Sequence, residues 1–210
     1  MKTALSLIAF LSLPLAAVRG ATVFTFESGF TAGQTTFTQG DLTVFLGGQL
    51  MVTEFPTFGS GEGDWFIDTG YGMPVSGDAG SISVTTTAIA GFRLLGMDLW
   101  TSNDGGNNYA AGNVTLTGLL ANGGSVSTVV AVTPTGDGGS DWDTTIDLSV
   151  FAGKTLTSLE ISLGPEINNI GIDNLSMESV AAVPEPSGHL ALLALGSTGL
   201  LTRRRLKRKA

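Results

Sequence analysis

The sequence contains no cysteine and only one histidine among its 210 residues. Without cysteine the chain can form no disulfide, carry no thiolate nucleophile and offer no cysteine ligand to zinc. The single histidine, His189, lies near the C-terminus, so the central part of the chain has none. Triads that use histidine as the general base are excluded there, and no nucleophile-elbow motif is present. We therefore expect no enzymatic activity.

Basic residues are also scarce in the central part of the chain. Between residues 21 and 182 only Arg93 and Lys154 are basic, against 17 acidic residues (the chain's 18 less Glu185), so the net charge of this part is −15. Such a surface repels nucleic-acid phosphates and anionic lipids. We expect no nucleic-acid partner, whereas divalent cations suit an acidic exterior.

The N-terminus has the three-part layout of a secretory signal peptide. Met1 and Lys2 provide a positive start, an apolar run follows, and small residues precede a cleavage site after Gly20. This layout predicts that residues 1–20 are removed during export. A permanent membrane anchor is the alternative interpretation.

The C-terminus combines a proline-rich strip, a short apolar run and a basic cluster. The strip consists of Val183, Pro184, Glu185, Pro186 and Ser187. Its two prolines disfavour helical backbone, so it should be extended. Residues 188–202 then predict a transmembrane helix of about 22 Å, short of the roughly 30 Å hydrocarbon layer. The basic residues that follow should snorkel, stop translocation and remain cytoplasmic; they are Arg203, Arg204, Arg205, Lys207, Arg208 and Lys209.

This order of parts resembles the PEP-CTERM sorting signal of Gram-negative bacteria. The resemblance implies recognition by an exosortase, a membrane-embedded processing enzyme, in organisms that secrete polysaccharide matrices. It also implies inner-membrane anchoring with the body in the periplasm, followed by delivery to the cell surface or extracellular matrix. Gly188 and His189 depart from the pattern, because an aromatic residue is common there. The expected organisation is a signal peptide (1–20), a folded domain (21–182) and a sorting signal (183–210).

The central part reads as short strands separated by glycine and asparagine turns. Apolar and polar residues alternate within several segments, as β-strands with one buried face require. No helical periodicity of useful length appears, and the 30 glycines suit a turn-rich all-β chain. The pattern predicts an all-β fold, an antiparallel β-sandwich of the jelly-roll type. The expected strands are 22–27, 42–46, 50–54, 81–86, 91–100, 113–120, 125–133, 144–150, 156–163 and 168–177.

Two acidic residues lie on the strands expected at the two ends of this domain. Terminal strands commonly pair in a sandwich, which would bring Glu27 and Asp173 together. Adjacent carboxylates repel unless they are protonated or bridged by a cation, although both could simply be solvated. The apolar phase switches between Ile172 and Leu175, as a β-bulge at Asp173 would cause.

Three segments resemble jelly-roll carbohydrate-binding modules. They are the initial "FTFESGF", residues 147–163, and the final "NNIGIDNLSM". In such modules the acids that correspond to Glu27 and Asp173 hold a structural calcium ion. The resemblance therefore implies Ca²⁺ as a structural cofactor. A further acidic group at Asp137, Asp141 and Asp143 lacks the spacing of a calcium loop, and we interpret it as a solvated loop.

Three aromatic residues in loop-rich segments are candidate ligand-binding residues: Trp65, Tyr71 and Trp142. Aromatic rings stack on sugar rings, although burial in the core is the ordinary alternative for a tryptophan. We expect a non-catalytic, exported β-sandwich protein of the cell surface or matrix. The alternatives are a lectin-like module that binds matrix exopolysaccharide and, with less support, a polysaccharide-cleaving enzyme that uses paired carboxylates.

Overall fold

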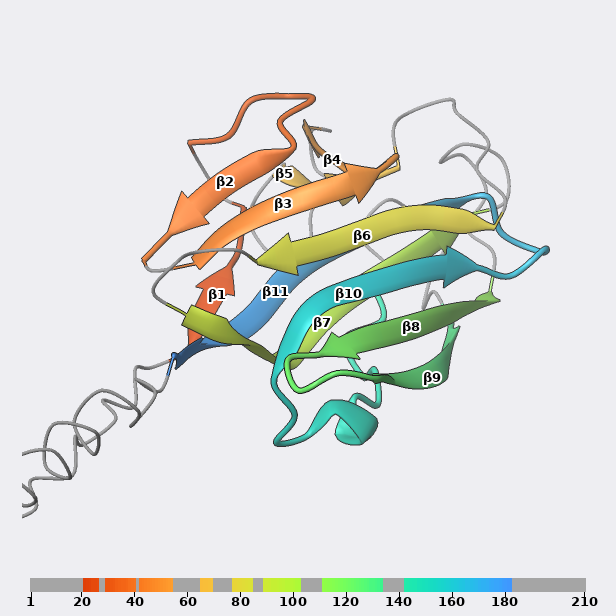
Figure 1. Ribbon diagram of the computed structural model, residues 1–210. Coiled ribbons are helices and arrows are strands. Elements are labelled where there is room, and N and C mark those ends of the chain that lie inside the picture. The colour runs from red at the N-terminus through yellow and green to blue at the C-terminus, as the bar shows by residue number, and fades with distance from the viewer. Residues whose placement is uncertain are drawn as a thin grey trace, which may run out of the picture.

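The computed structural model describes residues 21–26, 29–40, 42–54, 65–69, 77–84, 89–102, 111–133 and 142–182. These residues form eleven β-strands and one short 3₁₀ helix (Figure 1). The elements are β1 (Thr22–Phe24), β2 (Thr36–Gln39), β3 (Leu42–Gly48), β4 (Met51–Glu54), β5 (Trp65–Asp68), β6 (Asp78–Val84), β7 (Ile89–Ser102), β8 (Gly112–Leu120), β9 (Ser125–Val132), η1 (Ser149–Phe151), β10 (Leu156–Leu163) and β11 (Asn169–Ala181).

All strand pairings are antiparallel, and the strands follow the order β2-β3-β6-β10-β7-β11-β5-β4. In addition, β1 pairs with β11, β8 pairs with β10, and β9 pairs with β8. The sheet curls into a half-barrel, in which β3, β6 and β10 lie in front of β11 and β7 (Figure 1). This β-sandwich-like arrangement confirms the predicted all-β antiparallel fold.

The two layers meet where β10 passes β7. Their only register pair joins Leu156 to Phe92, and Gly91 precedes it with a φ of +152°. A Cβ atom at Gly91 would lie 2.2 Å from the carbonyl oxygen of Leu156. Glycine is therefore required at this corner, because only a residue without a side chain allows the two backbones to approach so closely.

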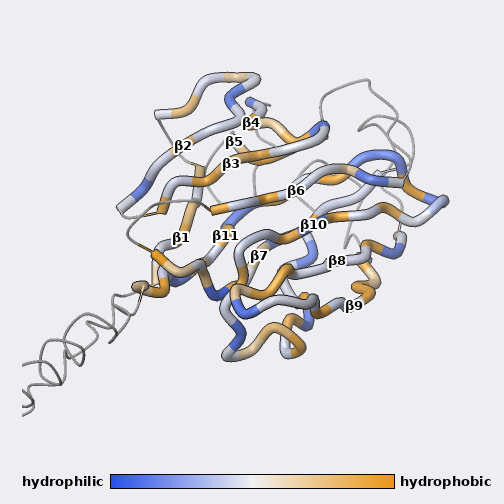
Figure 2. Tube along the Cα trace, viewed as in Figure 1, coloured by the Kyte–Doolittle hydropathy of each residue, from blue (hydrophilic) through white to orange (hydrophobic). Residues whose placement is uncertain are grey.

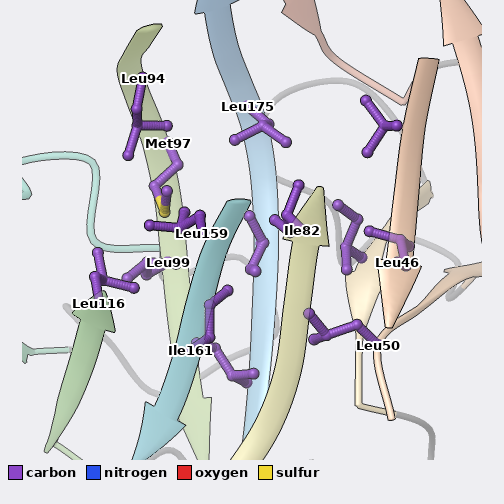
Figure 3. Packing of buried hydrophobic residues seen from close by; sticks show 14 of the residues in the cluster. Leu46, Leu50, Ile82, Leu94, Met97, Leu99, Leu116, Leu159, Ile161 and Leu175 are labelled. Atoms are coloured by element: carbon purple, nitrogen blue, oxygen red, sulfur yellow. The ribbon is translucent and has the colours of Figure 1, made fainter. Parts of the chain in front are cut away.

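The core fills the space between the layers. Apolar and polar residues alternate along several strands (Figure 2). In β8, for example, Val114 and Leu116 are buried while Thr115 is half-buried. Buried side chains from both layers interdigitate, among them Ile82, Leu159 and Leu175 (Figure 3). Burial of this continuous apolar cluster supplies the main stabilisation of a domain that has no disulfide.

The structure confirms nine of the ten predicted strand segments and overturns one. Residues 144–150 form no strand, and their last two residues belong to η1. The Asp147 side chain accepts a hydrogen bond from the Ser149 amide (2.9 Å). This local bond favours a turn and competes with strand pairing. Conversely, the prediction missed the four-residue strands β2 and β5.

The signal peptide and the sorting signal lie outside the described residues. Within the described ranges, no helix is long and apolar enough to cross a membrane. The predicted transmembrane helix at 188–202 falls beyond those ranges and stays a prediction.

Candidate functional site

The first and last strands of the domain lie side by side. In the register of β1 and β11, Thr22 is opposite Met177 and Phe24 is opposite Leu175. This pairing confirms the expectation that the terminal strands meet. Glu27 lies outside the described residues, so its approach to Asp173 stays a prediction.

Asp173 stands at a β-bulge in β11. It is opposite Asp98 of β7, and the next register pair joins Ser176 to Gly96. Asn174 and Leu175 of β11 therefore face the single residue Met97 of β7. Asn174 also takes a positive φ of 45°. This geometry confirms the predicted bulge. It also explains how Ile172 and Leu175, three positions apart, both reach the core.

The bulge places two carboxyl groups opposite one another. Asp173 is 1% exposed, and Asp98 is half-buried. Asn174 donates a hydrogen bond to each carboxyl group. Its backbone N–H donates to Oδ1 of Asp173 (2.6 Å), and its side-chain Nδ2 donates to Oδ2 of Asp98 (2.7 Å). Hydrogen-bond donors stabilise carboxylates against mutual repulsion. Asn174 thus organises the pair.

The acidic pair provides hard oxygen ligands of the kind that calcium prefers. Within the described ranges, no group of three or more acidic, histidine or cysteine side chains is arranged to hold a metal ion. A cation at Asp173 and Asp98 would therefore need further ligands from Glu27, from backbone carbonyls or from water.

A second polar group fixes the end of β5 to β11, and the sequence analysis missed it. Asp68, Thr69 and Asn169 are all buried. The Thr69 amide donates to Oδ1 of Asp68 (2.7 Å), and its hydroxyl donates to Oδ1 of Asn169. The same hydroxyl accepts from the Ile170 amide (3.4 Å). The signal in the sequence is the Asp68-Thr69 pair directly after the apolar residues of β5, a short strand that the hydrophobic pattern does not predict.

Trp142 packs into a small aromatic cluster with Phe66 and Trp100. It is 5% exposed, and its ring contacts Phe66 edge-on with centroids 5.5 Å apart. A Cβ atom at Gly171 would lie 2.8 Å from Cη2 of Trp142 and 3.1 Å from Cε3 of Trp100. The rings therefore pack directly on the glycine backbone. This burial leaves little of the Trp142 ring for a ligand.

The aromatic cluster covers the sheet face opposite the main core. Phe66, Trp100 and Gly171 alternate with Ile67, Leu99 and Ile172, which belong to that core. Successive side chains of a strand point to opposite faces. The central strands are therefore buried on both faces at this end.

Asp143 holds the segment that carries Trp142. Its backbone exchanges two hydrogen bonds with Leu99, at 2.7 and 3.1 Å. Its carboxylate accepts bonds from the Thr133 amide and from the amide and hydroxyl of Thr145. Burial alone would raise the pKa of Asp143, but these hydrogen bonds lower it overall. Asp143 is therefore a charged structural residue, whereas Asp137 and Asp141 lie outside the described residues.

Of the two other predicted aromatic positions, the structure describes one. Trp65 is half-buried at the start of β5 and packs against the main core. Tyr71 lies outside the described residues, two positions after Thr69. Their role as a sugar platform stays a prediction.

A shallow depression of about 400 Å³ opens beside β2. Its lining consists of Thr25, Phe26, Gly29, Phe30, Gln34, Phe37, Thr38 and Gln39. Phe30 lies 5.1 Å from Phe26 and 5.5 Å from Phe37, ring centre to ring centre. Gln34 bonds to the Thr31 amide and the Thr36 carbonyl, which orients its side chain. Phe26 and Phe37 are buried beneath the depression and Phe30 is half-buried, so polar groups supply most of its exposed lining.

Comparison with known families finds one match, at the C-terminus. The PEP-CTERM protein-sorting motif matches residues 182–205, directly after β11 ends at Ala181. The match includes the Pro-Glu-Pro strip and the first three arginines of the basic cluster. No curated protein matches the chain. The predicted PEP-CTERM signal is confirmed, and it indicates an exported protein that is anchored at the membrane before exosortase cleaves it.

Proposed function

We propose that this chain is a non-catalytic structural protein of the cell surface or extracellular matrix, with a jelly-roll body that exosortase releases from the inner membrane. The observation that carries the proposal is the sorting motif at residues 182–205, placed directly after the last strand of a folded domain. The body passes through the periplasm on this route. Its central part lacks histidine and cysteine, which supports a non-catalytic role.

The position of β11 suits release by proteolysis. β11 pairs with β1, β5 and β7, so it lies inside the sheet rather than at its margin. The chain leaves the domain only after Ala181. Cleavage beyond this point would remove the predicted membrane segment and leave all eleven described strands in place, so the released body would keep its core.

The test compares one protein in two hosts, with and without exosortase. With the enzyme, we expect a shortened body outside the inner membrane. Without it, we expect the full-length chain to remain in the inner-membrane fraction. Immunoblotting of fractions with an antibody against the body measures both size and location. Equal size and location in the two hosts would overturn the proposal.

The depression beside β2 supports a second candidate function, binding of matrix exopolysaccharide in a lectin-like manner. Phe30 is half-buried against the core, and the remainder of its side chain joins a lining that also carries amides and hydroxyls. Sugars bind to such combinations, because their C–H faces stack on rings while their hydroxyls bond to polar groups.

For this second function, we expect Phe30→Ala to weaken polysaccharide binding by about tenfold, the value of one lost ring contact. The matched control is Phe45→Ala, because Phe45 is an exposed phenylalanine on β3. Affinity electrophoresis with matrix polysaccharide measures binding, and thermal melting checks the fold. If Trp65→Ala or Tyr71→Ala abolishes binding and Phe30→Ala does not, the polysaccharide binds at Trp65 and Tyr71 rather than in the depression. Release of reducing sugars from matrix polysaccharide by the protein would contradict the non-catalytic role.

We also propose calcium as a structural cofactor at Asp173. A ligand that binds only the folded state raises its stability, so calcium at about 100 times its Kd should raise the Tm by roughly 5–10 °C. Asp173→Ala should abolish this rise. Glu54→Gln removes one charge at the exposed end of β4 and serves as the control that keeps the rise. An unchanged wild-type melting curve in chelator would exclude the calcium site.

A further inference from the structure

Among the described strands, β9 forms a long edge of the sheet that pairs only with β8. The two strands share eight consecutive register pairs, from Gly112 opposite Val132 to Leu119 opposite Ser125, with no register shift. Figure 1 shows β9 at the margin of the front layer. Within the described part of the chain, no backbone hydrogen bond joins the outer edge of β9 to another segment. A strand edge in this condition offers a row of donors and acceptors to another strand.

β9 lacks three of the features that usually protect an edge strand, and the short helix η1 lies near it. Its sequence, Ser125–Val132, contains no charged residue and no proline, and its ladder has no bulge. The other edge strands, each of which pairs with one neighbour, are shorter than β9: β1 has three residues, and β2 and β4 have four each. The chain next to β2 also bridges to β4 through Gln34 and Val52. Natural proteins protect exposed edges when pairing is harmful, so the bare edge of β9 favours a pairing role.

The charge distribution favours a second copy of this chain as the partner. The body carries a net charge of −15 from two basic and 17 acidic residues, yet residues 111–133 contain no charged residue. Two copies therefore repel one another over most surfaces and least along β8 and β9. Val129 lies on this neutral surface and, at 63%, is the most exposed large apolar side chain of the described residues.

We propose that two copies of the chain dock edge to edge through β9, in antiparallel register, with Val129 on the two-fold axis. The register follows from which face each side chain occupies. A two-fold axis through Val129 places Ser127 opposite Ala131 of the other copy, and Val126 opposite Val132. Inward side chains then meet inward ones and outward side chains meet outward ones, as a continuous sheet requires. The interface is closed and self-complementary, and it does not depend on the function proposed above.

Because the chain contains no cysteine, a single introduced cysteine can test this interface by disulfide cross-linking between two copies. In the full chain, Val129→Cys should form a disulfide-linked dimer under mild oxidation, because the two thiols lie across one strand pair. The matched control is Val23→Cys, because Val23 is an exposed valine on β1. Non-reducing electrophoresis measures the dimer, and mass spectrometry identifies the linked residues. Melting curves equal to wild type confirm that both variants fold.

A second substitution tests whether strand pairing drives the cross-link. Adding Ser127→Lys to Val129→Cys places two positive charges in the interface and should reduce cross-linking by about tenfold. The proposal is wrong if Val129→Cys cross-links no better than Val23→Cys. It is equally wrong if the lysine has no effect or if the thiol introduced by Val129→Cys links to a different protein.

Discussion

Alanine at Pro184, Glu185 and Pro186 together is expected to trap the full-length protein in the inner membrane. These residues lie within the matched sorting motif. The two prolines keep the strip extended, and alanine would allow it to join the helix that is predicted to follow. The apolar run at residues 188–202 and the basic cluster at residues 203–209 are unchanged, so export and insertion should proceed. Processing by exosortase should fall below detection on an immunoblot.

The control is a triple alanine substitution inside the predicted membrane segment, at Gly196, Ser197 and Thr198. It changes the same number of residues but keeps the strip and the basic cluster, so processing should continue. Deletion of residues 203–209 should fail in a different way, because it removes the charges that fix orientation. If the motif variant is processed as well as the wild type, the segment is a plain anchor rather than a sorting signal.

Replacing Gly91 with alanine is expected to be the most damaging single change in the body among those considered. The residue has a φ of +152°, and the added Cβ would lie 2.2 Å from the Leu156 carbonyl oxygen. Backbone strain of this kind costs about 1–3 kcal/mol, and overpacking costs about as much again. The clash cannot be relieved unless β7 and β10 part at their only register pair. We expect the free energy of unfolding to fall by about 3 kcal/mol or more, and the Tm by roughly 10 °C.

The matched control for this change is Gly96→Ala on the same strand. A Cβ atom there would meet only the Cβ of Ser176, at 3.9 Å, which is an ordinary contact. Thermal and urea melting of both variants would separate the corner effect from the general effect of glycine replacement. If the Gly91→Ala and Gly96→Ala proteins have the same Tm, the packing of β7 against β10 does not depend on the glycine at this corner.

Strand positions were predictable where the pattern is local. Residues 113–120 and 156–163 alternate apolar and polar residues between turn-forming glycines, and β8 and β10 occupy them to within one residue. The segment 144–150 has a similar pattern, but hydrogen bonds from the backbone to Asp143 and Asp147 turn it away from the sheet. Side-chain bonds to the local backbone compete with strand pairing. Hydrophobic period alone does not reveal this competition.

In the candidate sites, too, the local features were predictable from the sequence and the cross-strand contacts were not. The phase switch between Ile172 and Leu175 predicted the bulge, because a two-residue period is visible along one strand. Asp98 was not predicted as the neighbour of Asp173, because cross-strand register depends on how 11 strands align. Burial was the ordinary alternative for Trp142 and is confirmed, but the residues around its ring were not predictable. This burial results from the pairing of Asp143 with Leu99 and from the space that Gly171 leaves for the ring.

The sequence by itself therefore determined the linear properties of this protein: the all-β class, most strand positions, the acidic body and the sorting motif at residues 182–205. These properties depend on neighbouring residues, and a recognition strip at a chain end can be read without a fold. The tertiary structure alone decided which residues meet: Asp173 with Asp98, Phe30 with Phe37, and, within the described ranges, β9 with no strand beyond β8. Such meetings join residues far apart in the chain, and they depend on the packing of the whole sheet around one core.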